Sequence, residues 1–446
     1  MRLRTAVAAL AALGLLGCAH TSGGHNLSEL DEAKLSLDQG RAADALPKLQ
    51  RAHEANPSDL EVARLLVEAY VKSGQVSTLR QRLPNDRTTP KAVQSYMLGL
   101  ADFADPASAG AQAISDFRQA VQLAPKLPEL HYRLGLALLE SEQYDQALPE
   151  LTQAAELAPE KTTYQLPLAK ALARTGHRDQ AVGALRKVVM GKPTPADVKV
   201  ARALMEGIAD PFAGFPDAAR GRLERGINWL HNADVPQEAI IQFEDILRDY
   251  PDLGVVHALL GLSYQRLEDA GRAVDELKRA IELAPTVGKN WVYLGELYLS
   301  HQRSEPAQEA FEKALALDPL LDSAYLHLGD LAIERRDLPT AQSYFQALAS
   351  LQPDAIPPKG KLALAMELSG DYAGAARVLH QVVDKDPENV EFLLRLGLVE
   401  TASAKHAANA AEKQSHRDEA EHFLNEVLKR QPDNAIASRA LEDVKR

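Results

Sequence analysis

The chain has 446 residues, of which 46% are hydrophobic and 25% charged, and it carries a formal net charge of −12 at pH 7. An acidic surface of this kind argues against nucleic acid as a partner, because the phosphate backbone is itself negative. A single cysteine excludes a disulfide within the chain, so the fold has to be stable without cross-links. Length alone suggests about three domains, but the repeats described below replace that estimate.

The first 17 residues predict a secretory signal. Arg2 and Arg4 precede an uncharged apolar run from Thr5 to Leu16, which is the arrangement of an export signal. The run is too short to span a bilayer, because a membrane helix needs about 20 residues. Removal of residues 1–17 takes away two arginines and no acids, so the mature chain would have a net charge of −14.

The signal ends in Leu15, Leu16, Gly17 and Cys18, a run that resembles the lipobox of bacterial lipoproteins. The resemblance implies cleavage before Cys18, lipidation of its thiol and attachment to a membrane through the lipid. The alternative is an ordinary secretory signal whose cysteine is incidental. Ala19 follows the cysteine in place of an aspartate, which by the enterobacterial sorting rule implies an outer-membrane lipoprotein facing the periplasm.

Proline and alanine recur with a fixed period along the rest of the chain. Steps of 34 residues, or of twice 34, separate the prolines within each of two series, and an alanine lies twelve residues before most of them. The prolines are Pro57, Pro125, Pro159 and Pro193, then Pro251, Pro285, Pro319, Pro353 and Pro387. The alanines are Ala113, Ala147 and Ala181, then Ala239, Ala273, Ala307, Ala341 and Ala375. One register held over some 400 residues argues against an unrelated helical bundle.

Within a period the pattern predicts two packed helices. In residues 288–321, Trp291, Leu294 and Tyr298 fall on one face of a first helix. Small residues allow the second helix to approach closely, while Phe311 fills the space between the two, and Pro319 ends the second helix. The 34-residue period and these positions resemble the tetratricopeptide repeat. The resemblance implies an all-α, right-handed superhelical solenoid of about eleven helix-turn-helix repeats.

The register breaks at three places and so predicts a domain organisation. Pro84 and Asp86 predict a short second helix in the repeat at 60–93, and residues 196–219 contain an incomplete repeat with a loop bearing Phe212 and Phe215. These phenylalanines either contact a partner or tuck against neighbouring helices. An insertion of 11 residues lies near 402–417, in a segment of helix-forming residues. The predicted parts are a signal at 1–17, a tether at 18–25, arms at 26–195 and 220–434 joined by 196–219, and a capping helix at 435–446 with Ile436, Ala440, Leu441 and Val444 inward.

No catalytic motif is present in the sequence. The pair His53 and Glu54 lacks the second histidine of a zinc peptidase, and no phosphate-binding loop or nucleophile elbow occurs. His406, His416 and His422 are spaced so that they do not share a helix face, which favours solvated surface side chains. We therefore expect no catalytic residues, no metal, no cofactor and no small-molecule substrate, and we expect that the protein is not an enzyme.

The resemblance implies that the first helices of the repeats line a groove for a protein partner. No three successive repeats carry the lysine and asparagine set of chaperone-binding relatives. The implied groove is apolar with scattered charges, which suits an amphipathic helix or an extended apolar segment; the alternative is that many of these positions are buried between helices. The predicted groove residues are Tyr132, Leu136, Leu139, Leu166, Lys170, Arg174, Leu262, Val292, Glu296, Leu299, Leu326, Asp330 and Ile333.

Three functions compete at this point. The favoured one is a membrane-anchored scaffold that assembles or stabilises a bacterial cell-envelope machine, such as a pilus, secretion, export or motility complex. The second is an adaptor that recruits or regulates an envelope enzyme, such as a peptidoglycan hydrolase or a protease. The third is an enzyme in its own right. From Cys18 to Leu27 a fully extended chain reaches only roughly 30 Å at about 3.3 Å per residue, so the repeats would work close to the membrane.

Overall fold

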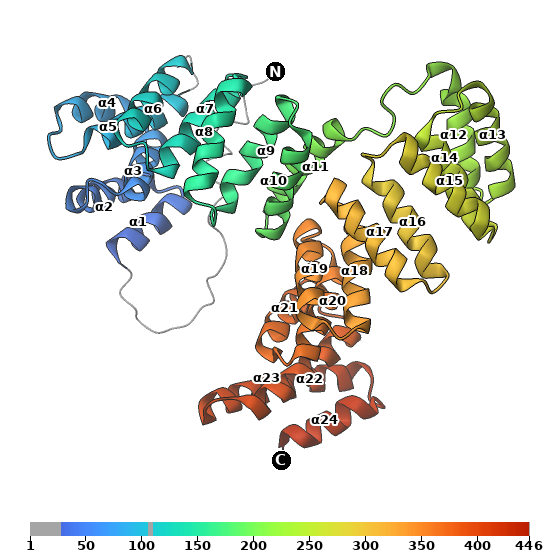
Figure 1. Ribbon diagram of the computed structural model, residues 1–446. Helices are drawn as coiled ribbons and strands as arrows, with labels where there is room; N and C mark the ends of the chain where they lie inside the picture. The colour runs from blue at the N-terminus through green and yellow to red at the C-terminus, as the bar shows by residue number, and fades with distance from the viewer. Residues whose placement is uncertain (1–27, 106–109, 446) are drawn as a thin grey trace. The chain divides into compact units, whose positions relative to one another are not determined.

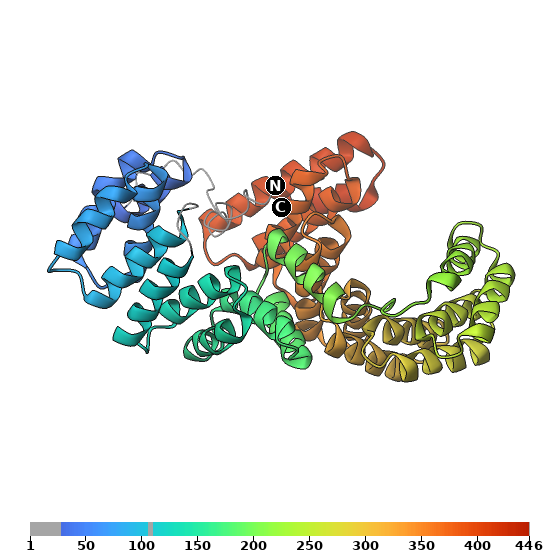
Figure 2. The ribbon, with the colours of Figure 1, turned by 90° about the horizontal axis from the view of Figure 1, so that it is seen from above.

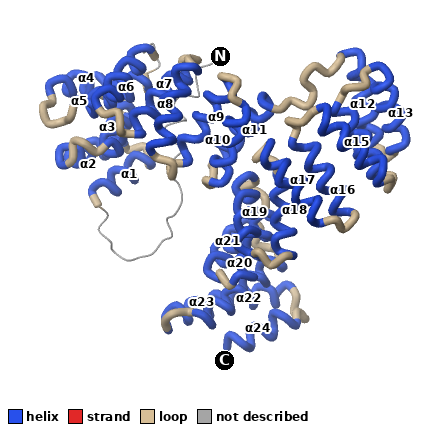
Figure 3. The backbone as a smooth tube through the Cα atoms, in the orientation of Figure 1, coloured by secondary structure: helices blue, strands red, loops and turns tan. Residues whose placement is uncertain are grey.

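The structure, a computed structural model, describes residues 28–105 and 110–445. The signal, Cys18 and the tether lie outside these residues, so their interpretation stays a prediction. Figure 3 shows helices joined by short loops, and no strand occurs among the described residues. The predicted all-α solenoid of helical hairpins with a final capping helix is confirmed.

The chain divides into two compact units at the turn between His177 and Arg178, and each is described by itself (Figures 1 and 2). The predicted arm boundaries stay a prediction. The first unit contains α1 (Glu29–Asp38), α2 (Ala42–Ala55), α3 (Leu60–Lys72), α4 (Val76–Arg82), α5 (Lys91–Phe103), α6 (Ala111–Leu123), α7 (Pro128–Glu140), α8 (Tyr144–Leu157) and α9 (Gln165–Arg174). Two short 3-10 helices, Leu83–Asn85 and Thr162–Tyr164, precede α5 and α9.

The second unit contains the remaining helices. They are α10 (Arg178–Met190), α11 (Pro195–Ile208), α12 (Asp217–His231), α13 (Pro236–Asp249), α14 (Gly254–Arg266), α15 (Ala270–Leu283), α16 (Gly288–Ser300), α17 (Ser304–Leu317), α18 (Asp322–Glu334), α19 (Leu338–Leu351), α20 (Ile356–Ser369), α21 (Tyr372–Lys385), α22 (Val390–His406), α23 (Ala410–Arg430) and α24 (Ala435–Lys445). From α14 to α23, even-numbered helices are the first and odd-numbered helices the second helix of a repeat.

The hairpin of α16 and α17 shows how a repeat packs. Phe311 and Ala314 of α17 are fully buried, and Leu294 of α16 is 3% exposed. Gly295 lies against the ring of Phe311, so closely that a Cβ on Gly295 would be 2.7 Å from Cε1 of Phe311. Helix α17 ends at Leu317, two residues before Pro319. The small residues therefore set the distance between the helices, as the sequence pattern indicates.

The turn between the two helices keeps one conformation from repeat to repeat, although the residue type at the turn varies. Gly370 has a φ of +83°, in the left-handed region that a glycine adopts without strain. Glu268, Gln302 and Arg336, at the same place in the three preceding repeats, have φ values of 59°, 56° and 60°. A left-handed residue commonly ends a helix, so the turn keeps its geometry although its residue type changes.

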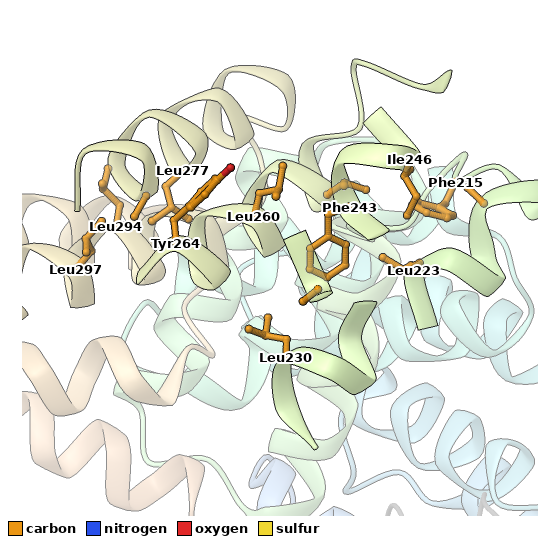
Figure 4. Packing of buried hydrophobic residues seen from close by; sticks show 14 residues of the cluster. Phe215, Leu223, Leu230, Phe243, Ile246, Leu260, Tyr264, Leu277, Leu294 and Leu297 are labelled. Atoms are coloured by element: carbon orange, nitrogen blue, oxygen red, sulfur yellow. The ribbon is translucent and has the colours of Figure 1, made fainter. Parts of the chain in front are cut away.

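Figure 4 shows one core cluster of the second unit, which runs from Phe215 before α12 to Leu297 of α16. Phe215 is 6% exposed and packs into this core beside Leu223, Phe243 and Ile246, whereas Phe212 is 41% exposed. The two rings meet edge to face, 6.3 Å apart. One phenylalanine of the predicted loop is thus a core residue, and the other lies at the surface. The predicted short helix in the repeat at 60–93 is confirmed, because α4 has only seven residues.

Helices α10 and α11 contact repeats that are far away in the sequence but belong to the same unit. Arg186 donates to the carbonyl oxygen of Leu315 at 3.1 Å. Arg202 donates to both carboxylate oxygens of Asp322, at 2.9 and 3.0 Å. Helix α10 therefore packs against α17 and α19, and α11 packs against α19. In a simple solenoid each repeat contacts only its neighbours.

The last hairpin is longer than its neighbours. Helix α22 has 17 residues and α23 has 21, while α20 and α21 have 14 each. The capping helix α24 buries Ala437, Ala440 and Val444. The prediction that Ile436 points inward is wrong, since its side chain is 59% exposed. Ala437, Ala440 and Val444 follow the i, i+3, i+7 spacing of one helix face, which places Ile436 outside it.

The contact between the two helices of a repeat predicts that a glycine-to-alanine substitution lowers the stability at one position and raises it at another. In Gly329→Ala the new Cβ would lie 2.4 Å from Cε1 of Phe345, and overpacking of this kind costs about 1–3 kcal/mol. In Gly183→Ala, inside α10, nothing lies within 4 Å of the new Cβ, and replacing an interior helical glycine contributes about 1 kcal/mol. Urea unfolding should show lower stability for the first variant and higher stability for the second. Equal effects would contradict this packing model.

A half-buried histidine links the two helices of one repeat. His257 of α14 lies 2.6 Å from Glu276 of α15 through Nδ1 and 3.0 Å from the carbonyl oxygen of Pro251 through Nε2. Burial opposes the charged ring, but the hydrogen bonds with Glu276 and Pro251 outweigh it and raise the pKa of His257 above its ordinary value of 6.5. The folded chain therefore holds this proton more tightly than the unfolded chain does.

The raised pKa predicts a pH-dependent contribution to stability. The contribution of His257 is fully present below pH 6.5 and is lost as the pH rises through the folded-state pKa. The free energy of unfolding of His257→Gln should therefore fall further below that of the unmodified chain at about pH 6 than at about pH 9. The measurement is urea unfolding of both proteins at each pH. The same difference at both values would rule out a charged His257.

Candidate functional site

The first helices of the second unit, α14, α16, α18, α20 and α22, together form what we call the first-helix face. Leu262, Leu299, Leu326 and Ile333 are half-buried there. Val292 is 3% exposed, so most of its surface is already used inside the fold. The sequence-predicted apolar residues therefore contribute unequally, and four of the five offer surface to a partner.

Polar and charged contacts connect successive helices of the first-helix face. Glu296 of α16 lies 3.5 Å from His327 of α18. Asp330 of α18 lies 2.6 Å from Lys361 of α20, and Glu367 of α20 lies 2.8 Å from Arg395 of α22. Burial raises the pKa of Glu367, although Arg395 opposes the shift. The predicted groove charges Glu296 and Asp330 thus already have partners in the neighbouring repeat.

The predicted groove residues of the first unit lie on α7 and α9. Tyr132 stacks on Tyr164, with ring centroids 4.5 Å apart, and Glu129 accepts a hydrogen bond from the Tyr164 hydroxyl at 3.1 Å. Burial and the nearby Glu129 carboxylate raise the pKa of Tyr164. Of the other predicted residues, Leu139 is buried and Arg174 is exposed. The half-buried ones are Leu136, Leu166 and Lys170.

A histidine and carboxylate cluster that the sequence did not reveal lies at the end of the second unit. His380 of α21, Glu400 of α22, and His416 and Glu419 of α23 come together there. The prediction that His416 is a solvated surface side chain is wrong, because its Nδ1 lies 2.6 Å from Oε2 of Glu400. The four residues come from three helices, so no spacing in the sequence links them.

The pKa values of His380 and Glu400 are shifted in opposite directions. A hydrogen bond with Glu400 is the main reason that the pKa of His380 lies above its ordinary value. Burial by itself raises the pKa of Glu400, but hydrogen bonds from His380 and His416 outweigh it and leave that pKa below the ordinary value. The raised pKa of His380 and the lowered pKa of Glu400 both favour opposite charges on these two side chains.

Comparison with known families identifies the repeats. Two models, both described as tetratricopeptide repeat, match this chain: one at residues 36–78, 138–205 and 368–443, and the other at 110–161, 258–319 and 294–356. Together they cover well over half of the sequence. The chain is therefore a protein of tetratricopeptide repeats. It belongs with the repeat scaffolds that bind other proteins or peptides, and neither model describes a catalytic family.

Solved structures that match this chain are similar to it only at a low level. YrrB, described as a tetratricopeptide-repeat protein with an unusual peptide-binding site, is 17% identical, with a TM-score of 0.39, and the match covers 45% of this chain and 97% of YrrB. The heterotetramer Cut9–Hcn1 gives 15% identity, a TM-score of 0.36, and coverage of 94% of this chain and 96% of that one. No curated protein sequence matches.

None of the helices in 28–105 and 110–445 is long and apolar enough to cross a membrane.

Proposed function

We propose that this protein is a lipid-anchored scaffold that assembles or stabilises a bacterial cell-envelope machine, such as a pilus, secretion, export or motility complex. The observation that carries the proposal is the joining of two features in one chain. The sequence from Arg2 to Cys18 resembles a lipoprotein signal, and the repeats that follow bind proteins. The short tether between them would hold the repeats at the periplasmic face of an outer membrane.

The first-helix face supports a partner with apolar contacts. Leu299 and Leu326 lie half-buried on successive first helices, while the charges between them, Glu296 and Asp330, are paired within the chain. A partner that brings an amphipathic helix or an extended apolar segment would cover the leucines without leaving these charges unpaired.

A second candidate is an adaptor that recruits or regulates an envelope enzyme, such as a peptidoglycan hydrolase or a protease. The same anchor and the same face would serve it. The two candidates differ only in the bound protein: a pore or barrel subunit supports the first, and a hydrolase or protease supports the second.

The anchor predicts the outcome of one substitution. In Cys18→Ser the thiol that would carry the lipid is gone, so the protein should move from the membrane fraction to the soluble fraction of the cell. Fractionation of cells that express each form, followed by immunoblotting, makes the measurement. The variant Ala19→Ser keeps the thiol and should stay with the membrane. Continued membrane retention of Cys18→Ser would remove the lipid anchor from the proposal.

The partner surface predicts the outcome of a matched pair of variants. In Leu299→Glu combined with Leu326→Glu, a bound apolar segment would have to desolvate two carboxylates, so crosslinking in intact cells should recover at least ten times less partner. The control is Ile241→Glu on the second helix α13, where the side chain is already 54% exposed. Circular dichroism should show the same helix content in all forms. Partner recovery that is unchanged in the double variant, or lost equally in the control, would place binding elsewhere.

A further inference from the structure

The cluster of His380, Glu400, His416 and Glu419 has no role in the binding face described above. Nε2 of His380 lies 3.1 Å from Oε2 of Glu419 and 3.5 Å from Oε1 of Glu400. One ligand atom from each of these three residues lies within 4.8 Å of the other two. Zinc bonds of about 2.0–2.1 Å in tetrahedral geometry place ligand atoms roughly 3.3 Å apart. The two distances from His380 are therefore already close to the edges of such a site, and the ligand atoms of Glu400 and Glu419 lie within 4.8 Å of each other.

We propose that His380, Glu400 and Glu419 bind one divalent transition-metal ion, with zinc the favoured ion, and that His416 positions Glu400 for it. One imidazole nitrogen with two carboxylate oxygens is a donor set that suits zinc and its neighbours, whereas magnesium and calcium prefer oxygen alone. The fourth position of the ion is left to water.

The burial of Glu400 supports the proposal. Its carboxylate is 2% exposed, and a charge so far removed from water has to be paired or has to coordinate a metal. Among the described residues no lysine or arginine forms an ion pair with Glu400 or Glu419; both pair only with histidines. The two carboxylates carry a charge of −2, which one divalent ion balances.

His416 occupies the place of an outer partner of a metal ligand. Its Nδ1 lies 2.6 Å from Oε2 of Glu400, which is the carboxylate oxygen that His380 does not contact. Ligating carboxylates are commonly held by such a second hydrogen bond, which fixes their orientation. His416 is therefore a positioning residue.

The long last hairpin creates this arrangement. If α23 had the 14 residues of α21, it would begin at residue 417 and would not contain His416. Apolar side chains cover part of the cluster. The ring of Phe423 contacts the His380 ring edge to face, with the ring centres 5.5 Å apart. Leu396, Val399 and Ala420 of α22 and α23 are buried in the adjoining core. A bound ion would tie α21, α22 and α23 together.

The test is zinc binding by the mature chain. The protein is prepared with Cys18→Ser and a tag without histidine, stripped with EDTA and dialysed. Isothermal titration with ZnCl2 should give one ion per chain, and zinc should raise the thermal midpoint by several degrees. Addition of Co²⁺ should give the visible absorption bands of a tetrahedral site.

Four variants decide which residues bind. Glu419→Gln and His380→Gln, at partly exposed positions, should fold normally and lose at least 100-fold in zinc affinity. His416→Gln should keep the stoichiometry and lose about 10–100-fold, as outer partners do. The control is His131→Gln, since His131 bonds a glutamate, Glu150, at 2.7 Å and a carbonyl group without a second carboxylate; its zinc affinity should not change. No zinc binding, or an isotherm unchanged in Glu419→Gln and His380→Gln, would overturn the proposal.

Discussion

Many repeats of this protein, among them those of α14 to α19, depend on one close contact, in which a side chain of the second helix occupies the space that a Cβ of the first helix would need. The ring of Phe311 lies against Gly295, and that of Phe345 against Gly329. In the repeat before them Leu277 takes the same place against Gly261. Because the contact allows a hydrogen atom and nothing larger, it fixes how near the two helices lie, and that spacing is carried from one repeat to the next.

The fixed spacing leaves the outer faces of the helices free to take on other interactions. On the first-helix face, Asp330 reaches Lys361 and Glu367 reaches Arg395 in the following repeat. These ion pairs join successive repeats in addition to the packing of their cores. A protein that binds here therefore meets leucines that are available and charges that are already paired, so apolar contact favours binding more than charge does.

Residues that obey the period were predictable from the sequence, because the same packing requirement returns every 34 positions. Phe311 and Pro319 were recognised in this way, and the structure places them as expected. The ion pair between Arg202 and Asp322 could not be predicted from the sequence, since the two residues are 120 residues apart and share no repeat position. The left-handed turn at Arg336 could not be predicted either. A glycine at this position would have indicated a left-handed conformation, whereas an arginine does not.

The end of the array shows why departures from the period deserve as much weight as the period itself. A terminal repeat has no neighbour to cover its outer side, so it needs its own means of stabilisation. Helix α24 meets part of that need by burying Ala437, Ala440 and Val444 against the last hairpin. The added length of α22 and α23 meets another part, because it brings His416 beside Glu400 and joins two helices through a buried polar contact. The capping helix by itself packs on the last hairpin, and without the polar cluster α21 would be held to that hairpin by core contacts alone. The bonds of His380 to both glutamates extend the link to that helix, so the polar cluster and the capping helix stabilise different sides of the same terminal repeat.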